Sequence, residues 1–114
     1  MQERVEITPI EGRNGYQNIN ITKQLKPGQF IVAKKKYKSG KEVQSQYGTS
    51  YLCQVEYNGD NVGMFLKEKY HPDFESAGDA GDDIKIGIVA DSFFHQKQNK
   101  QIVYMKPMFE VYNG

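Results

Sequence analysis

The residues best suited to chemistry in this chain are lysines and aromatic rings, and they are most concentrated at positions 34–41. This segment contains five lysines and one ring with no acid between them: Lys34, Lys35, Lys36, Tyr37, Lys38 and Lys41. Ammonium groups along a groove contact phosphates and flat rings stack on bases, a combination typical of single-stranded nucleic-acid binding. The same lysines also suit a solvated edge strand, where positive charge prevents pairing with other chains. Both interpretations stay open for this segment.

Rings and cations recur at two further places. In the segment 62–67, Phe65 and Lys67 share one face, so Phe65 is exposed if the residues on the opposite face form the core. The alternative face assignment makes Phe65 a core residue. The segment 92–101, expected to be a loop or a hairpin tip, contributes two rings and two cations: Phe93, Phe94, Lys97 and Lys100. One of the two adjacent Phe rings is expected to face the core.

Two tyrosines complete the candidate set. Tyr47 lies in a polar segment at 39–48, expected to be a loop, where a ring is either exposed or packed over the end of the core. Tyr51 alternates with Cys53 and Val55, which favours core packing. It stays a candidate because a tyrosine hydroxyl can reach the rim of a core while its ring is buried.

No spacing typical of catalysis or metal binding is present in the sequence. His71 and His95 are far apart, and Cys53 is the single cysteine, which excludes an intramolecular disulfide and a Cys-based metal site. The acids at 79–83 do not match a calcium loop, and no phosphate loop or nucleophile elbow is found. We therefore expect no enzyme activity, catalytic residues, metal or cofactor.

Composition indicates an ordinary globular chain. Its 114 residues fit one domain, 1–114, in which 1–18 is an N-terminal arm or an extra strand. The net charge of +1 hides a polarised distribution, because acids concentrate in 68–83 and lysines in 34–41. No apolar stretch approaches the length of a membrane span, so we expect a soluble, cytoplasmic protein.

Alternating hydrophobicity predicts a mainly β fold. After a short alternation at Ile19 and Ile21, five strands are expected at 29–38, 49–57, 61–69, 84–90 and 102–112. The tetrad 58–61, Asn-Gly-Asp-Asn, predicts a tight hairpin between the second and third of these strands. Pro72 followed by acids predicts a short helix at 70–77, and Pro107 indicates a sheet edge or a bulge.

This order resembles the OB-fold, a five-stranded Greek-key barrel with one short helix between strands 3 and 4. The similarity covers roughly residues 19–112 and is to the compact single-stranded-DNA-binding OB domains of bacterial, archaeal and viral replication systems. In such domains, nucleic acid crosses strands two and three between two flanking loops. The resemblance thereby implies a binding surface at 34–50, 52–67 and 92–101, where the lysines and rings lie. Two departures are the lack of Trp and the acids Glu56 and Glu68 on the central strands.

We expect this chain to bind single-stranded DNA with little sequence preference, during replication, repair or recombination. Single-stranded RNA in place of DNA stays open as the ligand. We expect the protein to form a homo-oligomer, with a dimer favoured. The main alternative function is a non-catalytic protein-interaction or structural module that uses the same aromatic segments. Carbohydrate binding by the same face is a weaker alternative.

Overall fold

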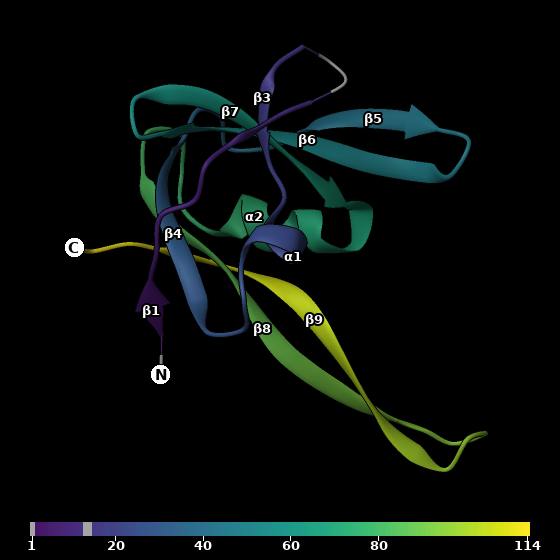
Figure 1. Cartoon of the computed structure of the whole chain (residues 1–114). Coiled ribbons are helices and arrows are strands. Elements are labelled where there is room, and N and C mark those ends of the chain that lie inside the picture. Colours follow the sequence, from purple (N-terminus) through teal and green to yellow (C-terminus); the bar gives the residue numbers. More distant parts are fainter. Residues whose placement is uncertain (1, 13–14) are drawn as a thin grey trace.

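A computed structural model describes residues 2–12 and 15–114 of the chain. The elements follow in the order β1 (Glu3–Arg4), β2 (Ile10–Glu11), β3 (Gln17–Ile19), α1 (Ile21–Gln24), β4 (Gln29–Lys35), β5 (Lys41–Ser45), β6 (Gly48–Tyr57), β7 (Asp60–Lys67), η1 (Glu68–Tyr70), α2 (His71–Ser76), β8 (Asp83–His95) and β9 (Lys100–Val111). The chain is mainly β, as expected, and one short helical segment separates β7 from β8 (Figure 1).

The described strands form one open, mixed sheet of nine strands, and the expected closed five-stranded barrel is not what they show. The order is β2-β3-β7-β6-β4-β8-β9, with β1 added to β4 and β5 added to β6. The physical reason lies at β7: its outer edge is taken by β3 in parallel register, Asn18 opposite Gly63 and Ile19 opposite Met64. Because β3 and not β9 pairs with β7, β9 is an edge strand of the sheet that the described residues form. This agrees with the sheet edge predicted from Pro107.

The β6–β7 hairpin confirms the prediction from the Asn-Gly turn. Asn58 and Gly59 both have positive φ, 51° and 84°, as a tight hairpin turn requires. The resulting register pairs Cys53 with Met64 and Val55 with Val62 on the inner face. Those four residues and Leu66 are buried in the core, so the face assignment that exposes Phe65 is the observed one.

Strand pairing extends into two segments: 39–48, which was expected to be a loop, and 92–101, which was expected to be a loop or a hairpin tip. Residues 41–45 form β5, which pairs with β6 around the short turn 46–47. β8 and β9 stay paired as far as His95 opposite Lys100, so only 96–99 turn. Both hairpins extend beyond the body of the protein on the same side and diverge from one another (Figure 1). Pairing between the strands provides hydrogen-bond partners for the backbone N–H and C=O groups of these polar segments. A search for alternating apolar residues does not detect strands that are held together in this way.

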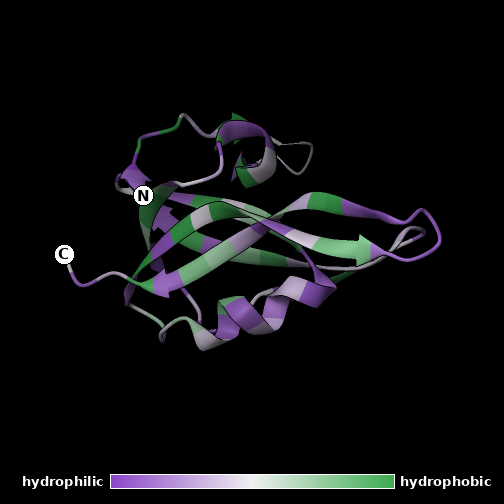
Figure 2. Ribbon diagram, turned by 90° about the horizontal axis from the view of Figure 1, so that it is seen from below, coloured by the Kyte–Doolittle hydropathy of each residue, from purple (hydrophilic) through white to green (hydrophobic). Residues whose placement is uncertain are grey.

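The alternation noted at Ile19 and Ile21 does not continue as a strand, because β3 ends at Ile19 and α1 begins at Ile21. Asn20 caps α1, and its side chain accepts a hydrogen bond from the backbone N–H of Lys23 (3.2 Å). Ile19 and Ile21 both reach the core, although a helical turn begins between them. Figure 2 shows α1 and the N-terminal segment on one side of the strands, with η1 and α2 on the other.

Cys53 lies at the centre of this core and is fully buried. Burial raises the pKa of its thiol to about 12. We expect no reaction of Cys53 with a thiol reagent at pH 8 in native buffer, because the thiolate is both scarce and inaccessible. Quantitative reaction should follow in denaturant. Rapid native labelling at the rate of a free thiol would contradict the packing described here.

Candidate functional site

The solvent-facing side of β6 and β7, here called the outer face, has five of the fourteen candidate residues on it or at its border. Register across three strands sets Lys41, Leu52 and Phe65 in one row, and Val43, Ser50 and Lys67 in the next. Phe65 is 50% exposed although it belongs to a central strand of the sheet. A large exposed ring that shares its row with one lysine and has a second lysine in the next row is suited to stacking on a flat ligand with negative charge beside it.

Two lysines of the 34–41 segment also border the outer face. Lys34 is paired in register with Glu56 of β6, and the backbone N–H of Lys36 donates to the carbonyl of Gln54 (3.2 Å). The carboxylate of Glu56 would repel a phosphate, but the cross-strand position of Lys34 places a compensating charge beside it. Lys34, Lys36, Lys41 and Lys67 are all exposed. Lys41 and Lys67 lie nearest to Phe65 in register, and Lys34 and Lys36 border the part of β6 nearer the β6–β7 turn.

Lys35, expected among the phosphate contacts, is instead a core residue. Lys35 is only 1% exposed, and its ammonium donates hydrogen bonds to the carbonyls of Phe74 (2.7 Å) and Gly78 (3.2 Å). The same Nζ lies 4.2 Å from the centroid of the Phe74 ring. Burial is the main cause that holds the pKa of Lys35 below its ordinary value. The inward phase of strand β4 therefore removes Lys35 from the surface, and it ties β4 to α2 instead.

Lys38 and Tyr37 follow the end of β4. Lys38 is exposed but already paired, because its ammonium lies 2.9 Å from Asp79 Oδ1 and also donates to two carbonyls of the 75–78 segment. This hydrogen bond lowers the pKa of Asp79. Tyr37 is 56% exposed and can contact a ligand, whereas Lys38 must give up an ion pair to do so.

Tyr51, kept as a candidate for its hydroxyl, points to the inner side of β6 and not to the outer face. Its ring stacks on His71 with centroids 3.7 Å apart. His71 Nε2 accepts the backbone N–H of Gly40 (2.9 Å), and its Nδ1 lies 3.4 Å from Glu75 Oε1. The Tyr51–His71 stack thus joins α2 to the start of the β5–β6 hairpin, which is a structural role.

The tip of the β5–β6 hairpin carries Tyr47, whose side chain is 90% exposed. The interpretation in which Tyr47 packs over the core is therefore wrong. The Ser45 hydroxyl binds both the backbone N–H of Tyr47 (3.2 Å) and the carbonyl of Gly48 (3.1 Å), which fixes the turn that presents the ring.

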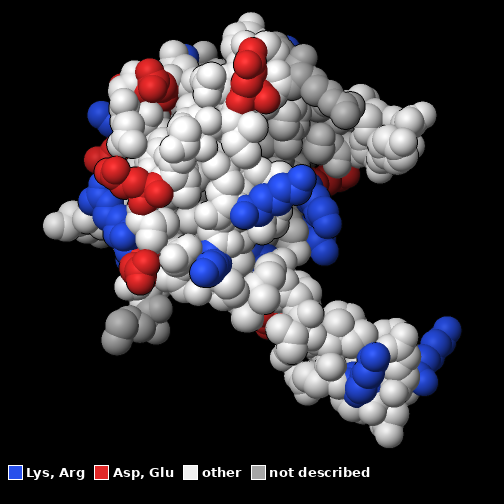
Figure 3. All heavy atoms as spheres, viewed as in Figure 1, with Lys and Arg blue, Asp and Glu red and all other residues white. Residues whose placement is uncertain are grey.

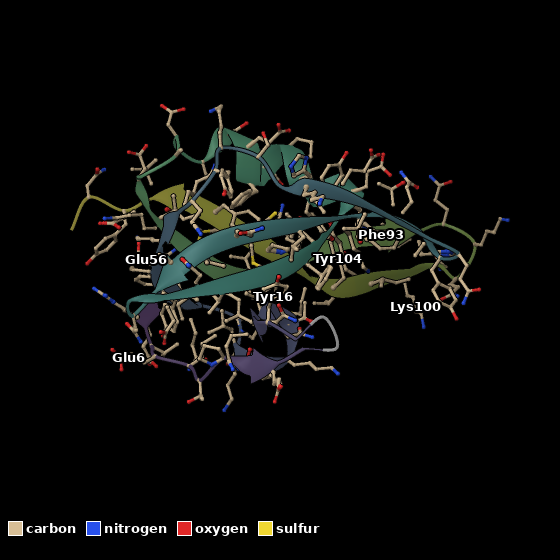
Figure 4. The ribbon with its side chains drawn as sticks, turned by 90° about the horizontal axis from the view of Figure 1, so that it is seen from above. Glu6, Tyr16, Glu56, Phe93, Lys100 and Tyr104 are labelled. Carbon is tan, nitrogen blue, oxygen red and sulfur yellow. The ribbon has the colours of Figure 1, made fainter. Side chains whose placement is uncertain are left out.

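The β8–β9 hairpin presents Phe93 and Phe94 on opposite faces, as adjacent residues of a strand must be. Both are about half exposed, so neither packs in the core as one of them was expected to do. Phe93 lies beside Tyr104, with ring centroids 5.8 Å apart, and Lys100 lies further out toward the tip (Figure 4). Lys97, also at the tip, is exposed.

The base of this hairpin is electrostatically neutralised. Asp91 accepts the Tyr104 hydroxyl (3.2 Å) and lies 3.1 Å from the ammonium of Lys106. The backbone N–H of Ser92, followed by Lys106 and Tyr104, lowers the pKa of Asp91. The cations available beyond this point are consequently Lys97 and Lys100. Figure 3 shows Lys and Arg at the tip without Asp or Glu, and a second group over α1.

Three residues that the sequence did not single out also lie on exposed surfaces. Val103 and Met105 are large apolar residues on β9, 63% and 46% exposed, and Lys23 is exposed on α1. The sequence predicts a single strand at 102–112, and no local signal distinguishes its projecting half from its packed half.

Among residues 2–12 and 15–114, no group of three or more His, Cys, Asp or Glu side chains is arranged to hold a metal ion. None of the helices in that part of the chain has the length and apolar character needed to cross a membrane. No protein-family model matches the chain, and neither a curated protein nor a solved structure does. The functional conclusion therefore depends on the residues of the outer face and the two hairpins.

Proposed function

We propose that this protein binds single-stranded DNA non-catalytically and with little sequence preference. The observation that carries the proposal is the exposed Phe65 ring on β7, with Lys41 in its own row and Lys67 two residues along its strand. Lys34 and Lys36 extend the positive border toward β4. Bases would stack on Phe65, Tyr37, Tyr47 and the rings of the β8–β9 hairpin, while the lysines neutralise phosphates.

The arrangement of the central strands supports the OB-fold hypothesis. The stretch β7-β6-β4-β8-β9 of the sheet has the order of OB strands 3-2-1-4-5, with α2 between the third and fourth. In that comparison the open seam lies between β7 and β9. The two diverging hairpins correspond to the loops that flank the ligand in OB domains, so the proposed strand would cross the outer face between them.

Low sequence preference follows from the residue types. Rings and ammonium groups bind any base and any phosphate, whereas sequence is read by side chains that form paired hydrogen bonds to base edges. On the outer face, β6 and β7 contribute two amide side chains that could read a base edge: Gln54 next to Leu52, and Asn61 near the turn. We further propose a homo-oligomer, with a dimer favoured, acting in replication, repair or recombination.

A salt titration tests the proposal directly. Affinity for an unstructured oligodeoxythymidine, measured by fluorescence anisotropy, should fall steeply with salt, with a slope of about 0.7 per phosphate neutralised. Four to six outer-face and hairpin lysines would give a slope of about 3–4 on this scale. Undetectable binding at low salt would refute nucleic-acid binding. It would favour the protein-interaction alternative, for which the exposed Val103 and Met105 are the supporting observation.

A further inference from the structure

The open seam between β7 and β9 contains a groove next to the outer face. It is walled by the 10–12 segment, α1, the end of β7 and the base of the β8–β9 hairpin, and it has a volume of about 580 Å³. That volume falls within the range of clefts that take small organic ligands, roughly 300–1,000 Å³. The groove exists because β3 and α1, and not β9, cover the edge of β7.

The groove has an apolar floor and an exposed apolar rim. Ile19, Ile21 and Leu66 form the buried floor. Ile10, Phe65 and Met105 stand around the opening, each about half exposed. A flat aromatic ligand can therefore enter against Phe65 on one side and Met105 on the other, where a polarisable sulfur favours contact with rings.

Its charges are two cations and one acid. Lys23 and Lys67 line the groove, and neither ammonium takes part in an ion pair within the described residues. Glu11 is the one carboxylate among the lining residues. The polar groups of α1 are already used, because Asn20 binds Thr22 and the N–H of Lys23 while Gln24 binds the N–H of Asn20. The lysines are thus the groups available to a charged ligand.

We infer that this groove binds one nucleotide of the strand that crosses the outer face, with its base between Phe65 and Met105 and its phosphate near Lys23 and Lys67. The inference rests on the proposed function. It is favoured over other occupants because Phe65 and Lys67 belong to both surfaces, so a strand on the outer face continues into the groove without a break. The two ammonium groups, set against a single carboxylate among the lining residues, also complement a phosphate at the apolar floor of the groove.

Matched substitutions test this site separately from the outer face. Met105→Asp removes an apolar contact and adds a charge that repels phosphate, so affinity for oligodeoxythymidine should fall at least about tenfold. Val111→Asp is its control, because Val111 is similarly exposed on the same strand but does not line the groove. Lys23→Ala should reduce the salt slope by about 0.7, whereas Lys26→Ala, just beyond α1, should leave it unchanged.

Photocrosslinking supplies a second readout that does not depend on a variant. An oligodeoxythymidine carrying one 5-iodouracil should crosslink to Met105 or Tyr70, as identified by mass spectrometry. If wild type and the outer-face variant Phe65→Ala differ in affinity while Met105→Asp and Lys23→Ala bind like wild type, and no crosslink reaches the groove, the groove site is wrong and the proposed function stands. Failure of wild type to bind any strand would overturn both.

Discussion

Replacing Phe65 by alanine should weaken binding of single-stranded DNA by roughly 5- to 150-fold, which corresponds to about 1–3 kcal/mol for one stacked base. The melting temperature should change little, because Phe65 is half exposed and the core face of β7 is formed by Val62, Met64 and Leu66. Anisotropy titrations and thermal unfolding, measured on the same samples, check both halves of this prediction.

Variants of the same position separate stacking from simple apolar contact. Phe65→Tyr keeps a flat ring and should retain most of the affinity, whereas Phe65→Leu keeps apolar area without a ring and should resemble Phe65→Ala. Phe74→Ala is the stability control, because Phe74 is fully buried and its truncation should cost about 3–5 kcal/mol of unfolding free energy. A comparable loss of stability in Phe65→Ala, or unchanged binding, would be inconsistent with the outer face as the site.

The neighbouring lysines Lys35 and Lys36 should give opposite results when each is replaced by alanine. Lys35→Ala removes a buried side chain with two hydrogen bonds to carbonyls and a contact with the Phe74 ring. We expect it to lower the free energy of unfolding by about 2 kcal/mol, since the carbonyls lose their partner and a cavity remains. Once corrected for the folded fraction, DNA affinity should stay unchanged.

Lys36→Ala should leave stability unchanged and reduce the salt slope of binding by about 0.7. Both variants remove one positive charge from adjacent positions, so each is the control for the other. Chemical denaturation gives the stability of each, and anisotropy at several salt concentrations gives the slope. Equal slopes for Lys36→Ala and wild type, or an unaltered stability of Lys35→Ala, would contradict this division.

The pH dependence of the Lys35 variant gives an independent check. The pKa of Lys35 is lowered in the folded state, so between the folded and unfolded pKa values the unfolded chain binds more protons. Wild type should therefore gain stability relative to Lys35→Ala as pH rises toward the unfolded value of 10.5, because the cost of the buried charge is relieved. Below the folded-state pKa of Lys35, where the side chain is protonated in both states, the difference between the two should be constant.

The sequence by itself determined the mainly β character, the β6–β7 hairpin and the position of Phe65 on the strand face opposite Val62, Met64 and Leu66; which of the two faces is buried was settled by the structure. Each of these follows from local rules: strand alternation assigns faces, and Asn58-Gly59 provides the positive φ of a tight turn. The sequence also identified the segments from which the candidate lysines and rings come, because clusters of like charge and adjacent rings are visible without coordinates.

The tertiary structure decided which of these residues are available and how the sheet is completed. The alternation of the strand alone cannot show that Lys35 is buried while Lys34 and Lys36 are exposed. The buried position of Lys35 depends on the carbonyls of Phe74 and Gly78, in α2 and just after it, some forty residues further along the chain. Backbone pairing likewise extended two polar segments into projecting hairpins, and pairing between distant segments placed β3 on the edge of β7. That edge pairing leaves the seam open toward β9 and creates the groove, a long-range arrangement with no signature in local composition.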